Sequence, residues 1–349
     1  MRIAILGTGS MAAAHARAFQ GIEGVEVVAG IDLHADRLNA FCKTHNIDKA
    51  FSDLGEALAW VQFDAIANVT PDQAHHSTTL KALAAGKHVF CEKPLATNHA
   101  DALEMAAAAE KAGLIGMVNL SYRNVNAVQK AREMVLGGEI GAVRHVEASY
   151  LQSWLSSAYW GDWRTEDRWL WRLSTRHGSN GVLGDVGIHI LDFASFGVGS
   201  EIADADCRMK AFAKAENDRI GEYNLDANDS FVMAVTFENG ALGTIHASRW
   251  ASGYSDDLSL RIFGSKGGLE VSYGGKDING QRIARLRACT GDNLLTHQWR
   301  EVPLGPVPTN YELFVQAIRE GRTIEPSFGH AAHLQKFLSQ EPERLAQSA

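Results

Sequence analysis

Two short stretches of the sequence carry side chains suited to proton transfer. In "VFCEKPL" (residues 89–95), an apolar run ends directly in an acid, a base and a proline around Lys93. In "GVLGDVGIHILD" (residues 181–192), Asp185 and His189 are four residues apart. A lysine in a partly desolvated site can share a proton with a hydroxyl, and a histidine beside a carboxylate transfers protons near neutral pH. Both stretches are therefore candidates for catalysis.

Each stretch also has a structural explanation. Glu92 and Lys93 would form a surface ion pair at a strand end, which stabilises little. Pro94 would fix the turn that follows, with a cis peptide bond as one option. In the second stretch, the acids would lie against the dipole of a helix whose histidine is packed in the core. Under the catalytic interpretation, Asp192 lies near His189, and the glycines open the helix to a ligand: Gly181, Gly184 and Gly187.

The N-terminal segment "AILGTGSMAAAHARAF" contains the pattern G-x-G-x-x-A between a predicted strand and a predicted helix. Gly7 would allow a tight turn, and Gly9 would let backbone amides approach a pyrophosphate at the helix N-terminus. Ala12 would let helix and strand pack closely. This context predicts a dinucleotide site that also includes Ser10 and Met11.

Asp32 ends the next predicted strand, twenty residues after Ala12. A carboxylate there would bind the ribose hydroxyls of the adenosine and repel a 2′-phosphate, so NAD is favoured over NADP. Arg37 leaves NADP open because a guanidinium can bind a phosphate. The alternative is that Asp32 only caps the helix that starts at Ala35.

The third predicted strand ends in "NVTPDQAHHS" (residues 68–77). Its carboxyl end faces the same crevice, which predicts cofactor neighbours at Thr70, Pro71, His75, Glu92 and Lys93. Adjacent histidines on a helix do not point in one direction, so His75 and His76 are not expected to bind a metal together. No metal site is predicted.

These groups need a scaffold, and apolar periodicity predicts one in two parts. Between residues 2 and 119, short apolar strands alternate with alanine-rich helices, which is typical of a doubly wound, parallel α/β sheet. Strands are expected at 2–6, 25–31, 64–70, 87–91 and 114–118, with helices at 12–20, 35–43, 76–85 and 99–112.

The second part begins with a helix at 125–136 and continues with a strand from residue 143. A helix at 182–196 and a hairpin that turns at Asn239-Gly240 are expected further along the chain. Strands are also expected at 205–213, 258–264 and 267–273. The predicted fold is a Rossmann domain, 1–122, followed by an α+β domain with an open, mainly antiparallel sheet, 123–349.

Composition narrows the class of protein. The 349 residues carry a net charge of −8, with a pI near 6.0. Nucleic-acid and anionic-membrane binders are usually basic. No apolar run reaches membrane-spanning length, and the first residues do not resemble a secretion signal. The four cysteines form no C-x-x-C pair. A cytoplasmic protein without a nucleic-acid or membrane partner is expected.

"GTGSMA", "TPDQAHH", "AGKHVFCEKPLA" and "GVLGDVGIHILD", in this order and spacing, resemble the glucose–fructose oxidoreductase / inositol dehydrogenase (Gfo/Idh/MocA) family over essentially the whole chain. The resemblance implies an NAD(P)-dependent oxidoreductase of sugars, inositols or related polyols that forms homodimers or homotetramers through its C-terminal sheet. By position, Lys93 matches the catalytic lysine, Asp185 the substrate-binding aspartate and His189 the acid/base histidine. Asp72 departs from the asparagine more often found there.

Further segments, "SYRN", "SYLQSW" and "LWRL", resemble glycoside- and anhydrosugar-oxidising members. This likeness implies a set of substrate contacts besides Asp185 and His189: Tyr122, Arg123, Gln152, Trp154 and Arg172. A polyol needs hydrogen-bonding groups and an apolar wall, which these side chains offer. For Trp154, Trp169 and Trp171, packing in the core or at an interface is an equal alternative.

The sequence thus predicts NAD-dependent oxidation of a sugar, glycoside or cyclitol hydroxyl to a ketone. His189 or Lys93 would take the proton, since coupled groups titrate together. Two alternatives are an NAD-using glycosidase that oxidises its substrate transiently and a non-catalytic sugar-binding regulator. Arginines crowd residues 164–176, but acids are interleaved with them, so a neutral substrate is favoured over an acidic or phosphorylated one.

Overall fold

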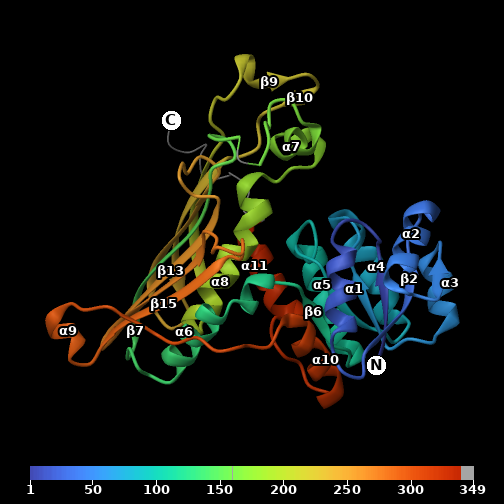
Figure 1. Ribbon diagram of the computed structural model, residues 1–349, viewed down its shortest axis with the longest axis horizontal. Coiled ribbons are helices and arrows are strands. Elements are labelled where there is room, and N and C mark those ends of the chain that lie inside the picture. Colours follow the sequence, from blue (N-terminus) through green and yellow to red (C-terminus); the bar gives the residue numbers. More distant parts are fainter. Residues whose placement is uncertain (159, 339–349) are drawn as a thin grey trace. The chain divides into compact units, whose positions relative to one another are not determined.

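The computed structural model describes residues 1–158 and 160–338, which form two compact units (Figure 1). Unit 1 combines residues 1–121 with residues 308–338, and unit 2 comprises residues 122–307. This corrects the predicted division into 1–122 and 123–349, because the last two helices pack with the first part of the chain. None of the helices in the described residues is both long and apolar enough to span a membrane.

Unit 1 contains a six-stranded parallel sheet with the strand order β3-β2-β1-β4-β5-β6. The strands are β1 (Arg2–Leu6), β2 (Glu26–Ile31), β3 (Lys49–Phe51), β4 (Ala65–Asn68), β5 (His88–Cys91) and β6 (Gly116–Val118). Most of their residues are buried, as in a parallel sheet covered on both faces. The strand order reverses between β1 and β4, and ligands bind at such a switch point, outside the carboxyl ends of the strands.

The described residues of unit 1 form the helices α1 (Ala12–Gln20), α2 (Ala35–His45), α3 (Leu54–Trp60), α4 (Asp72–Ala84), α5 (His99–Ala112), α10 (Asn310–Glu320) and α11 (Phe328–Leu338). Helix α10 starts with a capping box at Thr309 and packs aromatic rings into the core. Tyr311 lies 5.0 Å from Phe19 between ring centroids, and Phe314 lies 5.3 Å from Phe90. Helix α11 packs against α5 and β6. These contacts explain why the chain returns to unit 1.

Unit 2 is built on an eight-stranded sheet with the order β16-β15-β14-β13-β7-β12-β11-β8. Its strands are β7 (Val143–Gln152), β8 (Ile202–Lys210), β11 (Ser230–Phe237), β12 (Leu242–Ser248), β13 (Asp256–Gly264), β14 (Gly267–Gly274), β15 (Ile283–Thr290) and β16 (Arg300–Glu301). Neighbours are antiparallel except for β7 and β12. Buried and exposed residues alternate along β11, so one face is covered and the other is open.

Helices α6 (Asn126–Leu136) and α8 (Ile188–Val198) cover this sheet on one face. Figure 1 shows α7 (Asp167–Leu170), β9 (Arg219–Ile220) and β10 (Tyr223–Asn224) at one end of the sheet, and α9 (Asn293–Thr296) at the other. Short 3-10 helices are η1 (Ser121–Asn124), η2 (Trp171–Leu173), η3 (Thr175–His177) and η5 (Glu216–Asp218), and η4 (Leu183–Gly187) is a short π-helix.

Candidate active site

A pocket of about 560 Å³ lies at the carboxyl ends of the unit 1 strands. It is lined by all the predicted cofactor residues except His75: Gly7, Gly9, Ser10, Met11, Asp32, Arg37, Thr70, Pro71, Glu92 and Lys93. The sequence patterns at the ends of four different strands therefore come together around one cavity, as expected for a dinucleotide site.

The two glycines of the first turn serve different purposes. Gly7 has a φ of +86°, and a Cβ there would lie 2.6 Å from the carbonyl oxygen of Val69, the residue after β4, so the backbone leaves no room for a side chain. A Cβ at Gly9 would meet no other atom within 4 Å, so this backbone faces open space at the start of α1. That space is where a pyrophosphate would approach the amides.

Asp32 lies at the end of β2 and binds both turns around it. Its carboxylate accepts hydrogen bonds from the backbone and hydroxyl of Thr8 and from the backbone of His34, and Arg37 donates to both carboxylate oxygens. Burial alone would raise the pKa of Asp32, but these bonds hold it well below its usual range. The N-cap of α2 is His34, so Asp32 does not fill the capping position. A permanent negative charge thus lines the pocket.

Glu92 is paired within the core of unit 1. His15 Nε2 lies 2.7 Å from its carboxylate, and the Asn119 side-chain amide donates to the same oxygen at 2.8 Å. The backbone N–H of Lys93 donates to the other oxygen at 3.2 Å. Burial alone would raise the pKa of Glu92, but His15, Asn119 and the charge of Lys93 lower it to about 2. The acid of "EKP" therefore anchors the turn, whose Lys93–Pro94 peptide bond is cis.

We expect the stabilisation by Glu92 to depend on pH. Its folded-state pKa lies below the ordinary value of 4.5, so the contribution is fully present above about pH 4.5 and is lost as the pH falls toward 2. In urea unfolding between pH 6 and 3.5, the advantage of the wild type over Glu92→Gln should shrink by up to about 1.4 kcal/mol per pH unit. Glu110→Gln, at an exposed position, is the control. A constant difference between wild type and Glu92→Gln would contradict this explanation.

The adjacent histidines of α4 point in different directions. His75 is fully buried below the pocket, and its two ring nitrogens lie 2.8 Å from the Pro94 carbonyl oxygen and 2.9 Å from that of Thr70. His76 is partly exposed and pairs with Glu104 at 2.9 Å. Asp101 lies beside this pair, and the three groups have metal-ligating atoms within 4.8 Å of one another. In the structure, the Glu104 carboxylate is the hydrogen-bonding partner of the His76 ring.

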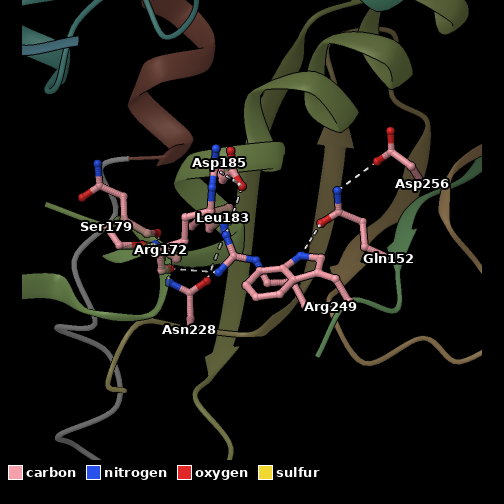
Figure 2. A network of polar contacts seen from close by, with 11 residues as sticks. Gln152, Arg172, Ser179, Leu183, Asp185, Asn228, Arg249 and Asp256 are labelled. Carbon is pink, nitrogen blue, oxygen red and sulfur yellow. Dashed lines mark hydrogen bonds and ion pairs between the residues drawn. The ribbon is translucent and has the colours of Figure 1, made fainter. Parts of the chain in front are cut away.

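In unit 2, Asp185 lies in the π-helix η4, immediately before α8. Arg172 donates to its Oδ2 atom at 3.2 Å and Arg249 donates to the same atom at 3.1 Å (Figure 2). The Arg249 side chain is 0% exposed, whereas that of Asp185 is 28% exposed. Two guanidinium groups therefore hold a partly accessible carboxylate in place. Short π-helical segments such as η4 are frequent at functional sites.

His189 lies on α8, where its ring contacts that of Tyr122 edge to face, with 4.8 Å between centroids. Asp192, which was expected near His189, is bound by the buried Arg123 through hydrogen bonds of 2.6 to 3.1 Å. Arg123 also lies over the Phe196 ring. This ion pair fixes η1 against α8. The guanidinium of Arg123, which was predicted to contact the substrate, therefore has Asp192 as its partner.

The Tyr122 hydroxyl belongs to a polar network on the helix-covered side of the sheet. It lies 2.5 Å from the Tyr150 hydroxyl and accepts a 3.3 Å hydrogen bond from Arg282. Arg282 also donates to Asp256. The Asp256 carboxylate in turn accepts a 2.9 Å hydrogen bond from the Gln152 side chain (Figure 2). Burial raises the pKa of Tyr122, so this phenol remains a neutral hydrogen-bonding group.

Some residues that were predicted to contact or admit a ligand pack against other protein atoms instead. Trp154 is 4% exposed in a core cluster, its indole N–H donates to Gln152, and Arg249 lies over its ring. A Cβ at Gly181 would lie 2.3 Å from the Asn228 side chain, and one at Gly184 would lie 2.2 Å from Asn180. These glycines therefore allow the loop to pack on itself, which replaces the expected opening toward a ligand.

Two family models together match most of the chain. The model described as "Oxidoreductase family, NAD-binding Rossmann fold" matches residues 1–120, and that of the "GFO/IDH/MocA C-terminal domain" matches residues 128–270. The crystal structure of an oxidoreductase domain protein from Kribbella flavida is similar, with 30% identity and a TM-score of 0.80 over 97% of this chain and 94% of that one. The chain belongs to the GFO/IDH/MocA family.

Relatives with assigned names support the enzyme class. Levoglucosan dehydrogenase of Pseudarthrobacter phenanthrenivorans is 23% identical over 94% of this chain and 92% of its own length. Myo-inositol 2-dehydrogenase of Thermotoga maritima is 28% identical over 76% of this chain and 74% of its own length. This GFO/IDH/MocA protein is accordingly an oxidoreductase, and its unit 1 is an NAD-binding Rossmann domain.

In each unit of this GFO/IDH/MocA protein, the sequence patterns missed polar residues that hold the candidate groups. The partners of Glu92 and Asp185, and the network around Tyr122, include His15, Asn119, Tyr150, Arg249, Asp256 and Arg282. Only one of them had a signal in the sequence: Arg249 comes just after the second strand of the predicted hairpin, and Lys93 likewise comes soon after a predicted strand. The others sit in ordinary helices, strands and loops, where their partners are remote in sequence.

Proposed function

We propose that the protein catalyses NAD-dependent oxidation of a hydroxyl of a sugar, glycoside or cyclitol to a ketone. His189 takes the hydroxyl proton, and Lys93 hydrogen-bonds the same oxygen and stabilises its developing negative charge. Asp185 binds a neighbouring hydroxyl. The pocket lined by Gly7, Gly9 and Asp32 would hold NAD, which would supply the acceptor for the hydride of the carbinol carbon. The same groups catalyse the reverse reaction. Because the two groups titrate together, Lys93 could instead act as the base while His189 hydrogen-bonds the reacting oxygen.

The observation that carries the proposal is the position of Lys93 on the wall of the NAD-binding pocket. It is the second residue after β5, at the carboxyl end of the strand, where ligands of open α/β sheets bind. The Glu92 carboxylate accepts from its backbone N–H, so the turn is held from within the core. A lysine placed next to a dinucleotide site is suited to a reacting hydroxyl.

A neutral polyol fits unit 2 better than an acidic or phosphorylated sugar. Three of the crowded arginines have carboxylate partners: Arg164 with Asp162, Arg168 with Glu166, and Arg172 with Asp185. These pairs reduce the field that an anion would feel. Asp185 and Tyr122 supply the hydrogen-bonding groups that a polyol requires.

NAD is the proposed cofactor rather than NADP. Asp32 lines the pocket as a carboxylate with a lowered pKa, and it would face a 2′-phosphate with like charge. Arg37, whose side chain is 49% exposed, forms an ion pair with Asp32. Its charge is therefore already neutralised by a carboxylate, which makes it a weaker partner for a 2′-phosphate. Ribose hydroxyls suit this acid better than a phosphate does.

A spectrophotometric screen tests the function. Purified protein is incubated with NAD and with NADP over inositols, hexoses, anhydrosugars, glycosides and sugar acids, and reduced cofactor is followed at 340 nm. NAD reduction by a neutral polyol is the expected result. Released aglycone without net NADH would indicate an NAD-using glycosidase. Binding of a sugar without either reaction would indicate a non-catalytic regulator.

We further propose that the protein is a homodimer or homotetramer associated through the open face of the unit 2 sheet. This face holds a pocket of about 520 Å³, and the exposed apolar side chains of Val232 and Leu242 lie on its strands. Light scattering should give a multiple of the 37.9 kDa chain mass, and Ser259→Arg on β13 should shift it to the monomer. A monomeric wild type at micromolar concentration would refute this assembly.

A further inference from the structure

Two fully buried histidines lie on the helices that begin at the cofactor pocket. His15 is on α1, which follows the glycine turn, and His75 is on α4, which follows Thr70 and Pro71. Neither side chain lines the pocket. Each contacts a direct sequence neighbour of Lys93, because His15 binds the Glu92 side chain and His75 binds the Pro94 carbonyl.

The contacts of His75 define its protonation state. Its Nδ1 lies 2.8 Å from the Pro94 carbonyl oxygen and its Nε2 lies 2.9 Å from the Thr70 carbonyl oxygen. A carbonyl oxygen only accepts hydrogen bonds, so both ring nitrogens have to donate. A neutral imidazole has one N–H, whereas the imidazolium has two. His75 therefore fits this site as a cation.

The surroundings of His75 favour the same state. Burial lowers the pKa of His75, but Cys91 on β5, the Pro94 carbonyl and Asp72 in the first turn of α4 together raise it to about 10. Hydrogen bonds to a charged donor are the stronger kind. The ends of β4 and β5 are thereby linked through one side chain.

His15 holds the other side of the turn. Its Nε2 lies 2.7 Å from a Glu92 carboxylate oxygen, and the second oxygen of Glu92 accepts the backbone N–H of Lys93. The rings of Phe90 and Tyr311 contact the His15 ring edge to face, at 5.8 and 5.3 Å. The imidazole therefore has little freedom to rotate.

We propose that His15 and His75 are positioning residues that form a two-histidine clamp on the turn carrying Lys93, and so connect this turn to both helices at the cofactor pocket. The catalytic consequence rests on the proposed function of Lys93. A displacement of about 1 Å in a catalytic group can cost 100-fold in rate. The clamp thus explains how a lysine on a turn is held in a fixed position.

Matched substitutions at His75 separate its two hydrogen bonds. In His75→Asn the amide takes the place of Nδ1 and keeps the bond to Pro94, whereas in His75→Gln it takes the place of Nε2 and keeps only the bond to Thr70. We expect kcat to fall less than about 5-fold in His75→Asn and about 100-fold in His75→Gln, with NADH affinity within about 3-fold of wild type in both. Equal kcat values in the two variants, or decreases in kcat that parallel the decreases in melting temperature, would overturn the clamp.

His15 provides a second, independent pair. His15→Gln keeps a donor at the Nε2 position for Glu92, whereas His15→Phe removes it and retains the ring. The glutamine variant should keep most of its kcat, and the phenylalanine variant should lose about 10- to 100-fold at unchanged KM for NAD. If the His75 variants do not fold, the two His15 variants alone test the clamp. Equal kcat values in His15→Gln and His15→Phe would contradict it.

Two measurements need no substrate and therefore remain valid if the proposed function fails. In protein labelled with 15N-histidine, His75 should show two ring N–H protons at pH 7 to 8, and a single N–H would refute the imidazolium. In crystal structures, residues 92–94 should be displaced in His75→Gln and unmoved in His75→Asn. An unmoved turn in both variants would overturn the clamp.

Discussion

Lys93→Met should lower kcat by about 100- to 10,000-fold, which is the range that one positioned proton-transfer group contributes. Methionine retains much of the side-chain volume but can neither share a proton nor stabilise an alkoxide. Lys93 lines the NAD-binding pocket without being part of the glycine turn, so NADH should still bind. Steady-state kinetics on the best substrate of the screen gives kcat, and protein fluorescence quenching gives the NADH dissociation constant.

The control for Lys93→Met removes a lysine of the same unit that lies outside the pocket. Lys111 is exposed in the last turn of α5, and Lys111→Met should leave kcat and NADH binding unchanged. If Lys93→Met retains full turnover, the proposed mechanism is wrong. If both NADH binding and kcat collapse, Lys93 is a cofactor-binding residue instead.

His189→Ala should also reduce kcat by at least about 100-fold, because the proton of the reacting hydroxyl loses its acceptor. The neighbouring groups remain: Asp185 keeps its two arginine partners, and Tyr122 keeps its bond to Tyr150. The variant should therefore fold normally. A pH series of kcat completes the test, since a group that takes the proton of the reacting hydroxyl contributes an ionisation to the wild-type profile that the variant should lack.

His145→Ala is the matched control for His189→Ala, because this histidine is exposed at the start of β7. Its kcat and pH profile should equal those of the wild type. An unchanged profile in His189→Ala would assign the observed ionisation to another group. Unreduced turnover in that variant would remove His189 from the mechanism altogether.

The local part of the site could be predicted from the sequence. Gly7, Gly9, Asp32 and Lys93 each lie at the end of a short apolar strand, and a parallel sheet brings such ends to one edge whatever the exact strand lengths. The hairpin turn at Asn239-Gly240 follows from the same kind of local rule, and β11 and β12 flank it in the structure.

The remainder depends on pairings between remote residues. Asp185 meets Arg249, 64 positions away, and Asn119 meets Tyr311, 192 positions away. No spacing rule connects such pairs, since only the folded sheet and its covering helices bring them together. The short β3 and α3 were missed as well, because three and seven residues are too few to show a period.

The return of α10 and α11 to unit 1 has a consequence for how the protein is made. Residues 1–121 emerge from the ribosome long before residues 308–338. Tyr311 and Phe314 nevertheless complete the aromatic core around Phe19 and Phe90. During synthesis, the domain that begins first is therefore the one that is finished last. Until residues 308–338 emerge, part of the apolar surface of α1 and β5 stays exposed to solvent, and exposed surface of this kind is prone to aggregation. The NAD-binding domain thus matures only after the whole of unit 2 has been translated.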